Sequence, residues 1–151
     1  MTERNNLENP LFLFTFLLIA IVLNTVASIH FLLIMLSGIL FIAFYICLKK
    51  RYLYSLFFVI LTFLFIEVNS GFKPLSLSLL SLFLYIFVLP KISRTVSFSS
   101  LNNYLYIIIF YIGVIIIWSL STDINETIAK AIILNILIDL IFLGILLWKH
   151  D

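Results

Sequence analysis

Two polar side chains lie inside the last long apolar segment of the chain, residues 126 to 148. Asp139 is the one acid well inside that segment, and Asn135 precedes it by one helical turn, so the two share a face and can hydrogen-bond. An ionised carboxylate near the centre of a bilayer costs about 2.5 to 3.5 kcal/mol, so Asp139 should face the interior of a bundle. Because no buried cation can pair with it, the pattern favours a neutral acid hydrogen-bonded between helices. A proton or ligand site is the alternative.

A second polar cluster interrupts the apolar sequence at FIEVNSGFKPLSLS, residues 65 to 78. Its Asn-Ser-Gly triplet favours the end of a helix, and Pro74 is typical of the first turn of the next one. Glu67 is not explained by this turn chemistry, and Lys73, six residues later, could form an ion pair with it across the hairpin. The candidate contact residues of the hairpin are Glu67, Asn69, Ser70, Gly71, Lys73 and Pro74.

The sequence contains no pattern typical of catalysis or of metal binding. His30 and His150 are the only histidines, Cys47 is the only cysteine, and the spans predicted below put the two histidines on opposite sides of a membrane. Paired carboxylates on one helix, a nucleophile motif and a phosphate-binding glycine loop are also missing from the sequence. We therefore predict no catalytic residue, no metal ligand and no cofactor.

The composition places the chain in a membrane. Of its 151 residues, 64% are hydrophobic and only 11% are charged, too few charges to cover the surface of a soluble domain of this length. The net charge of +2 is too small to indicate nucleic acid as a partner. The length predicts a single transmembrane domain over residues 1 to 151.

Spans of about 20 apolar residues cross a bilayer, and the sequence predicts an all-α bundle of six such helices. The expected helices cover about residues 11–26, 30–48, 52–68, 74–89, 104–121 and 126–148. If both termini are cytoplasmic, the inside holds seven cations and the outside two, which is the bias that inner loops usually show. The inside set is Arg4, Lys49, Lys50, Arg51, Lys91, Arg94 and Lys149, and the outside set is Lys73 and Lys130. Five of them, Lys49, Lys50, Arg51, Lys91 and Arg94, form a basic inner edge suited to lipid headgroups.

The hairpin resembles that of the MreD family, small six-helix membrane subunits of the bacterial rod-shape machinery with both termini cytoplasmic. That family shows an acidic residue, a Ser-Gly pair and a Pro- or Gly-containing helix start at the end of its third span. Glu67, Ser70, Gly71 and Pro74 occupy the corresponding places. The sequence departs from the family in having Glu67 for the usual Asp and a bulky third helix where glycines are common.

The resemblance implies a non-enzymatic scaffold in the bacterial cytoplasmic (inner) membrane. Such a subunit binds an MreC-like protein and couples it to a RodA-type glycosyltransferase and its transpeptidase partner, and to MreB filaments. On this interpretation the hairpin from Glu67 to Pro74 and the neighbouring helix faces hold the transmembrane helix of the MreC-like partner. The basic inner edge then lies against lipid headgroups or the filament.

Two other functions remain open from the sequence. The architecture is also similar to the substrate-binding membrane subunit of energy-coupling-factor vitamin transporters, in which Glu67, Asn69, Lys73 and the serines of LSLSLLSL would line a pocket. Those subunits tend to carry small residues four apart in the first helix, whereas Asn24 follows Ala20 here. An accessory subunit of an unrelated membrane complex is the third possibility.

Overall fold

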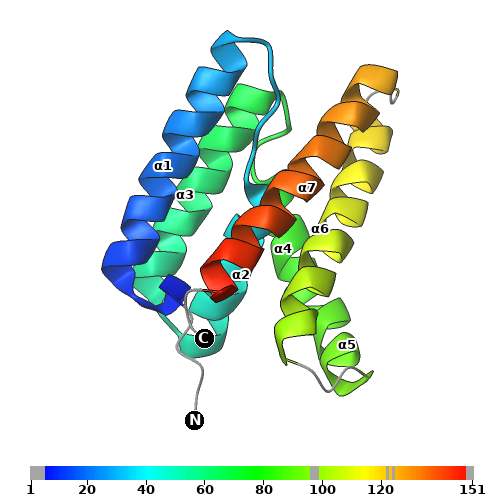
Figure 1. Cartoon of the computed structure of the whole chain (residues 1–151). Helices are drawn as coiled ribbons and strands as arrows, with labels where there is room; N and C mark the ends of the chain where they lie inside the picture. Colours follow the sequence, from blue (N-terminus) through cyan, green and yellow to red (C-terminus); the bar gives the residue numbers. More distant parts are fainter. Residues whose placement is uncertain (1–5, 96–98, 122, 124, 149–151) are drawn as a thin grey trace.

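The computed structural model describes residues 6–95, 99–121, 123 and 125–148, and every regular element in this part of the chain is helical (Figure 1). The predicted all-α class is therefore confirmed. The elements are η1 (Asn6–Glu8), α1 (Pro10–Ile29), α2 (Ser37–Lys50), α3 (Leu53–Ser70), α4 (Ser76–Phe83), the π-helical turn η2 (Leu84–Val88), α5 (Leu89–Thr95), α6 (Ser99–Ser121) and α7 (Glu126–Trp148).

Five helices of the described residues are long and apolar enough to cross a membrane, as expected of a multi-pass membrane protein. They are α1, α3, the continuous helix Ser76–Thr95 formed by α4, η2 and α5, and the long parts of α6 and α7, Leu101–Ser121 and Glu126–Leu147. The sixth, α2, has 14 residues. At 1.5 Å per residue it extends roughly 21 Å, less than the hydrocarbon core of about 30 Å.

The second predicted helix, 30–48, is wrong over its first third. The chain leaves α1 at Ile29, turns, and runs without helical structure from Leu32 to Leu36 before α2 begins at Ser37. In Figure 1 this stretch descends from one end of α1 towards the middle of the bundle. A run of apolar residues cannot distinguish a buried helix from a buried extended segment. The residues that hold it extended come from distant helices.

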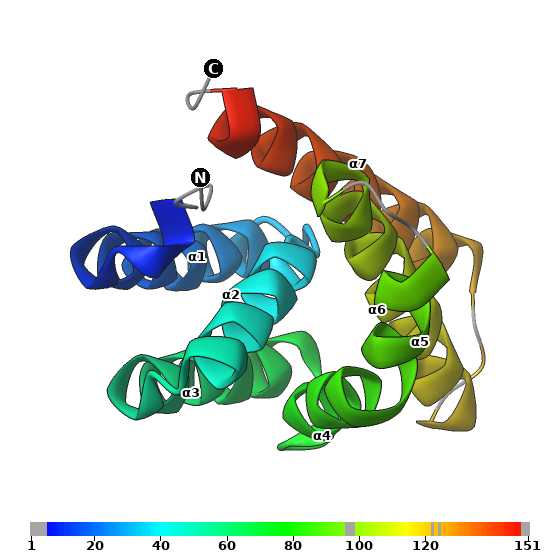
Figure 2. The same cartoon turned by 90° about the horizontal axis from the view of Figure 1, so that it is seen from below.

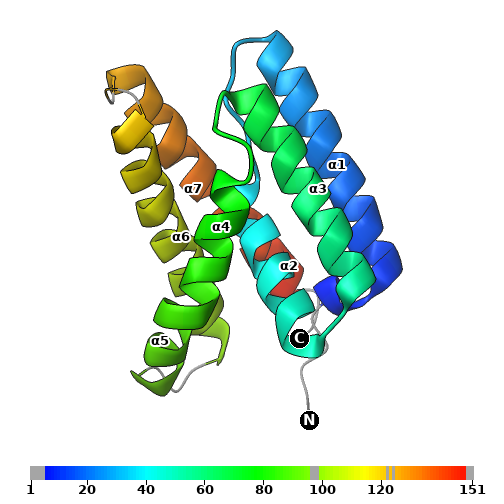
Figure 3. The ribbon, with the colours of Figure 1, turned by 180° about the vertical axis from the view of Figure 1, so that it is seen from behind.

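The short helix α2 is the centre of the bundle. Figures 1 and 2 show α1 packed beside α3 and α6 beside α7, with α2 between the two pairs. Every residue from Ser37 to Phe44 is buried, and the Phe41 ring stacks on Phe110 of α6 at 4.9 Å. The helix α4 packs against both α3 and α6 (Figure 3). Burial of an apolar helix on all sides therefore organises the fold around α2.

The basic residues expected at the inner edge lie at one end of the bundle. The end of α2, the start of α3 and the whole of α5 occupy that end, and Lys50 pairs there with Glu8 (Figure 1). The turn between α3 and α4 and the start of α7, with Lys73 and Lys130, occupy the opposite end. Lys130 pairs with Glu126 at 2.6 Å. Arg4 and Lys149 lie outside the described residues.

This arrangement predicts which positions share a side of the membrane. In a Cys47→Ala background, which removes the single buried cysteine, Lys73→Cys and Asp123→Cys should react with a membrane-impermeant maleimide from one side. Arg51→Cys and Arg94→Cys should react only from the other side, because helices of this length separate the two ends of the bundle. Labelling is measured on intact and on opened vesicles. Reaction of Lys73→Cys and Arg94→Cys from the same side would contradict the arrangement.

Candidate functional site

An asparagine of α7 holds one side of the extended segment that precedes α2. The side-chain oxygen Oδ1 of Asn135 accepts a hydrogen bond from the Met35 N–H at 2.8 Å, and its Nδ2 donates to the Leu33 carbonyl at 2.5 Å. The same Nδ2 also donates to the carbonyl of Ala131 at 2.8 Å. Asn135 is fully buried. It thus replaces the partners that two backbone groups would have in a strand or helix.

An asparagine of α1 holds the same segment from the other side. Asn24 Nδ2 donates to the carbonyl of Ile34 at 2.7 Å, and Asn24 is 2% exposed. Asn69, near the end of α3, donates from Nδ2 to the Asn24 Oδ1 at 2.7 Å, and the Ser70 hydroxyl lies 3.5 Å from Asn24 Nδ2. The segment is therefore connected through Asn24 to the α3–α4 turn.

Asp139, one turn after Asn135, meets the N-terminus of α2. Its Oδ2 accepts the Gly38 N–H at 2.8 Å and the Tyr111 hydroxyl at 2.6 Å, and the Ser37 hydroxyl donates to the Tyr111 oxygen at 3.3 Å. Free N–H groups and the helix dipole make such an N-terminus a favourable place for an acidic side chain. Asp139 Oδ1 is buried and has no hydrogen bond to any described residue. Both hydrogen bonds that the carboxyl group of Asp139 accepts from described residues therefore end on Oδ2.

The approach of Asp139 to α2 depends on Gly38. A Cβ atom at this position would lie 2.6 Å from Asp139 Oδ2, 2.9 Å from Ile107 Cγ2 and 3.0 Å from Tyr111 Cε2. Non-bonded distances below 3.0 Å between a Cβ and a heavy atom of a residue that is not its neighbour in the chain essentially do not occur in proteins. Glycine is therefore required here for space.

Glu67 performs a similar task for α4, and the predicted ion pair with Lys73 is wrong. Glu67 is fully buried at the end of α3, where its Oε2 accepts the Leu75 N–H and its Oε1 the Leu77 N–H, both at 2.6 Å. Lys73 is exposed and forms no ion pair with any described residue. The first turn of α4 therefore provides two N–H donors, which satisfy both oxygens without a cation.

The two capped helices share a backbone feature. A leucine in the left-handed conformation precedes each of them, Leu36 (φ 52°) before α2 and Leu75 (φ 68°) before α4. This conformation costs a residue with a side chain roughly 1 to 2 kcal/mol, so it persists only where the surroundings impose it. Asp139 and Glu67 supply such surroundings because they accept hydrogen bonds from the turn that follows each leucine.

The remaining sequence-predicted residues have separate positions. Gly71 ends α3 with φ 81°, a left-handed C-cap that glycine adopts readily, and Lys73 and Pro74 are exposed beyond it. The structure brings Asn69 and Ser70 to Asn24, whereas Glu67 turns inward to α4. The basic residues Lys49, Lys50, Arg51, Lys91 and Arg94 lie at the end of the bundle described above and are remote from this network in the fold.

Sequence reasoning missed four participants: Asn24, Ser37, Gly38 and Tyr111. Asn24 and Tyr111 are polar residues in apolar spans, and a buried polar group needs a hydrogen-bonding partner, so they were detectable as members of some network. The pair Ser37-Gly38 before an apolar run is also a helix-start signal. Nothing in the local sequence identifies which partner each residue would meet.

The chemistry of this network is structural support for a backbone inside the membrane. Its carboxyl group, Asp139, accepts hydrogen bonds from an N–H and a hydroxyl donor, and in the described part of the chain no three His, Cys, Asp or Glu residues gather as a metal site would require. We call Asn24, Asn69, Asn135, Asp139, Tyr111, Ser37 and the segment Leu32–Leu36 the polar network. Comparisons with protein-family models, curated proteins and solved structures find no match for this chain.

The space around Gly38 predicts a large effect of one added methyl group. Gly38→Ala should destabilise the protein by about 1 to 3 kcal/mol, the usual cost of overpacking, because the methyl group collides with Asp139 and Tyr111. Unfolding in detergent micelles measures the change. Gly144→Ala in α7 is the matched control, because its Cβ would approach only the Tyr104 hydroxyl, at 3.4 Å. Equal stability of the two variants would contradict the close approach at Gly38.

The two buried carboxyl groups should respond differently to replacement by amides. Asp139→Asn should change stability by less than about 1 kcal/mol, because one amide oxygen can accept both the Gly38 N–H and the Tyr111 hydroxyl. Glu67→Gln should cost about 1 to 3 kcal/mol, because its NH2 group would face an N–H that needs an acceptor.

The same unfolding assay provides the controls for these amides. Asp139→Leu, which leaves both donors without an acceptor, should cost at least about 2 kcal/mol. Destabilisation of Asp139→Asn to the level of Asp139→Leu would mean that the negative charge itself is required at α2.

Proposed function

We propose that this protein is a non-enzymatic membrane subunit that binds the transmembrane helix of a partner against its extended segment. The observation that carries the proposal is the segment itself, Leu32–Leu36, which passes between α1 and α7 in Figure 1. The N–H groups of Leu33 and Ile34 have no acceptor among the described residues. Leu32 is 53% exposed and the adjacent Phe31 is 98% exposed.

Exposure of this segment to lipid is unfavourable. Irregular backbone at membrane depth is tolerated where protein covers it or where it lines a water-filled cavity, because lipid tails offer no hydrogen-bonding partner. The side chains at the exposed part are Phe31 and Leu32, which favour an apolar cover over water. A helix is suited to this task because it satisfies its own backbone and presents apolar side chains.

The identity of the partner rests on the resemblance of the hairpin to the MreD family. On this proposal the partner is an MreC-like protein, and the complex links it to a RodA-type glycosyltransferase, its transpeptidase and MreB filaments in a bacterial inner membrane. Glu67 and Gly71, two residues of the resemblance, have clear physical tasks as the cap of α4 and the end of α3. These tasks support the view that the spacing of Glu67 and Gly71 serves the geometry of the hairpin. On this proposal the exposed residues around the hairpin make the contact with the partner.

The proposal also fixes an orientation. The basic end, with Lys49 to Arg51 and Lys91 to Arg94, faces the cytoplasm, where anionic headgroups attract it. The α3–α4 hairpin then faces outward, on the side where cell-wall synthesis takes place. A chain with so little mass outside its helices acts through its lateral faces and its two ends.

Photo-crosslinking in native cells tests the proposal. A photoreactive residue at Leu32 should capture a single-span MreC-like protein, identified by mass spectrometry. Leu137 on α7 is the matched control: it is equally exposed, at 53%, but lies two residues after Asn135 and so points away from the segment that Asn135 holds. We expect several-fold less capture of the same protein from Leu137.

Other outcomes distinguish the competing functions. Capture of a transporter coupling subunit, with no MreC-like protein from Leu32, would favour the vitamin-transport alternative. That alternative needs polar groups free to bind a ligand, whereas Glu67 and Asn69 make hydrogen bonds within the protein. Equal capture of many membrane proteins from both positions would mean that lipid alone covers the segment.

A further inference from the structure

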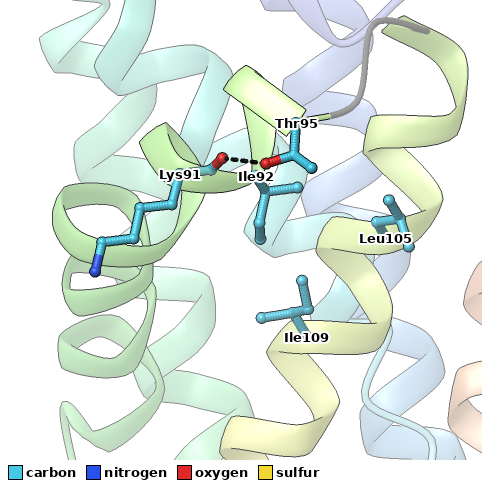
Figure 4. Close-up of a pocket in the computed structure, with 5 residues that line it drawn as sticks. All are labelled: Lys91, Ile92, Thr95, Leu105 and Ile109. Carbon is cyan, nitrogen blue, oxygen red and sulfur yellow. Dashed lines mark hydrogen bonds between the residues drawn. The ribbon is translucent and has the colours of Figure 1, made fainter.

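A recess opens between α5 and α6, at the basic end of the bundle (Figure 4). It is a shallow and widely open groove with a volume of about 370 Å³. It is lined by Lys91, Ile92, Thr95, Leu105 and Ile109. None of these residues belongs to the polar network or to the proposed partner contact.

The interior of the recess is apolar. Ile92 of α5 points towards Leu105 and Ile109 of α6 in Figure 4. The Thr95 hydroxyl donates to the Lys91 carbonyl at 3.1 Å, so it is already engaged within α5. The Lys91 side chain extends away from the three apolar side chains, so its ammonium group lies outside the recess. Such walls suit a hydrocarbon chain, and they offer a polar ligand few partners.

An irregularity of the helix accompanies the recess. The π-helical turn η2 leads directly into α5, and the Leu89 N–H bonds to the Leu84 carbonyl, five residues earlier. Pro90 follows and lacks an N–H, so it cannot make the hydrogen bond to the Ile86 carbonyl that an ordinary α-helix would have at this point. Single π turns of this kind occur frequently at functional sites.

The helix α5 beside the recess carries two positive charges. Lys91, which lines the recess, and Arg94, three residues later, are exposed on α5, and neither forms an ion pair with any described residue. The same end of the bundle carries Lys49, Lys50 and Arg51, and its one described acid, Glu8, is paired with Lys50. Lipid phosphate groups lie at this depth of a bilayer, and each nearby Lys or Arg attracts anionic lipid.

We propose that this recess is a binding site for an anionic phospholipid. One acyl chain lies between α5 and α6 against Ile92, Leu105 and Ile109, and the phosphate group meets the exposed cations of α5, Lys91 and Arg94, outside the recess. The site is independent of the proposed partner function, because it depends on the charge and shape of another face of the bundle.

Tryptophan quenching by brominated lipids tests the site. In a Trp118→Phe, Trp148→Phe background, Ile112→Trp places a reporter on the α6 face that carries Leu105 and Ile109, at a position that is 52% exposed. The protein is reconstituted into vesicles of equal parts phosphatidylcholine and phosphatidylglycerol, with bromine atoms on the chains of only one lipid at a time. We expect brominated phosphatidylglycerol to quench this reporter several-fold more effectively than brominated phosphatidylcholine.

Two comparisons decide the outcome. Leu137→Trp on α7, also near the middle of its helix, should be quenched equally by the two lipids. Adding Lys91→Gln and Arg94→Gln should abolish the preference at Ile112→Trp, since each cation contributes about fivefold to the attraction of an anionic lipid. Equal quenching at Ile112→Trp would overturn the proposal. So would a preference for phosphatidylglycerol that is the same at both reporters or that survives the double substitution.

Discussion

The hydrogen bonds between α7 and the backbone before α2 are the constraint on which this structure depends. A bilayer supplies no partner for an N–H or carbonyl group, so a chain that enters it in an extended form must find its partners in the protein. Asn135 supplies them for Leu33 and Met35, and Asp139 supplies one for Gly38. These bonds let α2 begin inside the bundle, where α3, α4, α6 and α7 pack against it.

Asp139 and Glu67 solve the same physical problem in two ways. Each lies on a helix that spans the membrane and caps another helix whose first residue follows a left-handed leucine. Asp139 divides one oxygen between a backbone N–H and a tyrosine hydroxyl, whereas Glu67 uses both oxygens for backbone N–H groups. Each carboxyl group accepts two hydrogen bonds, and the difference is that the backbone at the start of the capped helix provides one of the two donors for Asp139 and both for Glu67. An acidic residue inside a membrane is therefore informative about function only after its donors have been counted.

The polar network and the recess give the molecule two separate surfaces with different chemistry. The network includes a segment whose first residue, Leu32, is exposed, and the N–H groups of Leu33 and Ile34 have no acceptor among the described residues. The recess has apolar walls, and exposed cations lie beside it on α5. On the two proposals above, the first surface is covered by a protein helix and the second by a lipid.

The sequence alone determined that the chain is helical and membrane-embedded, because both properties depend on composition and on the length of apolar runs. It also located the α3–α4 turn and identified Asn135 and Asp139 as polar residues inside an apolar helix, since turn residues and isolated polar residues stand out in an apolar chain. Only the tertiary structure decided that residues 32 to 36 are extended, that Glu67 faces α4 and not Lys73, and that Gly38 lies against Asp139. Each of these depends on hydrogen bonds or contacts that bring separate helices together, up to about a hundred residues apart in the case of Gly38 and Asp139. Local pattern cannot specify such pairings, because the same apolar residues are compatible with a helix or an extended segment until a distant partner selects one.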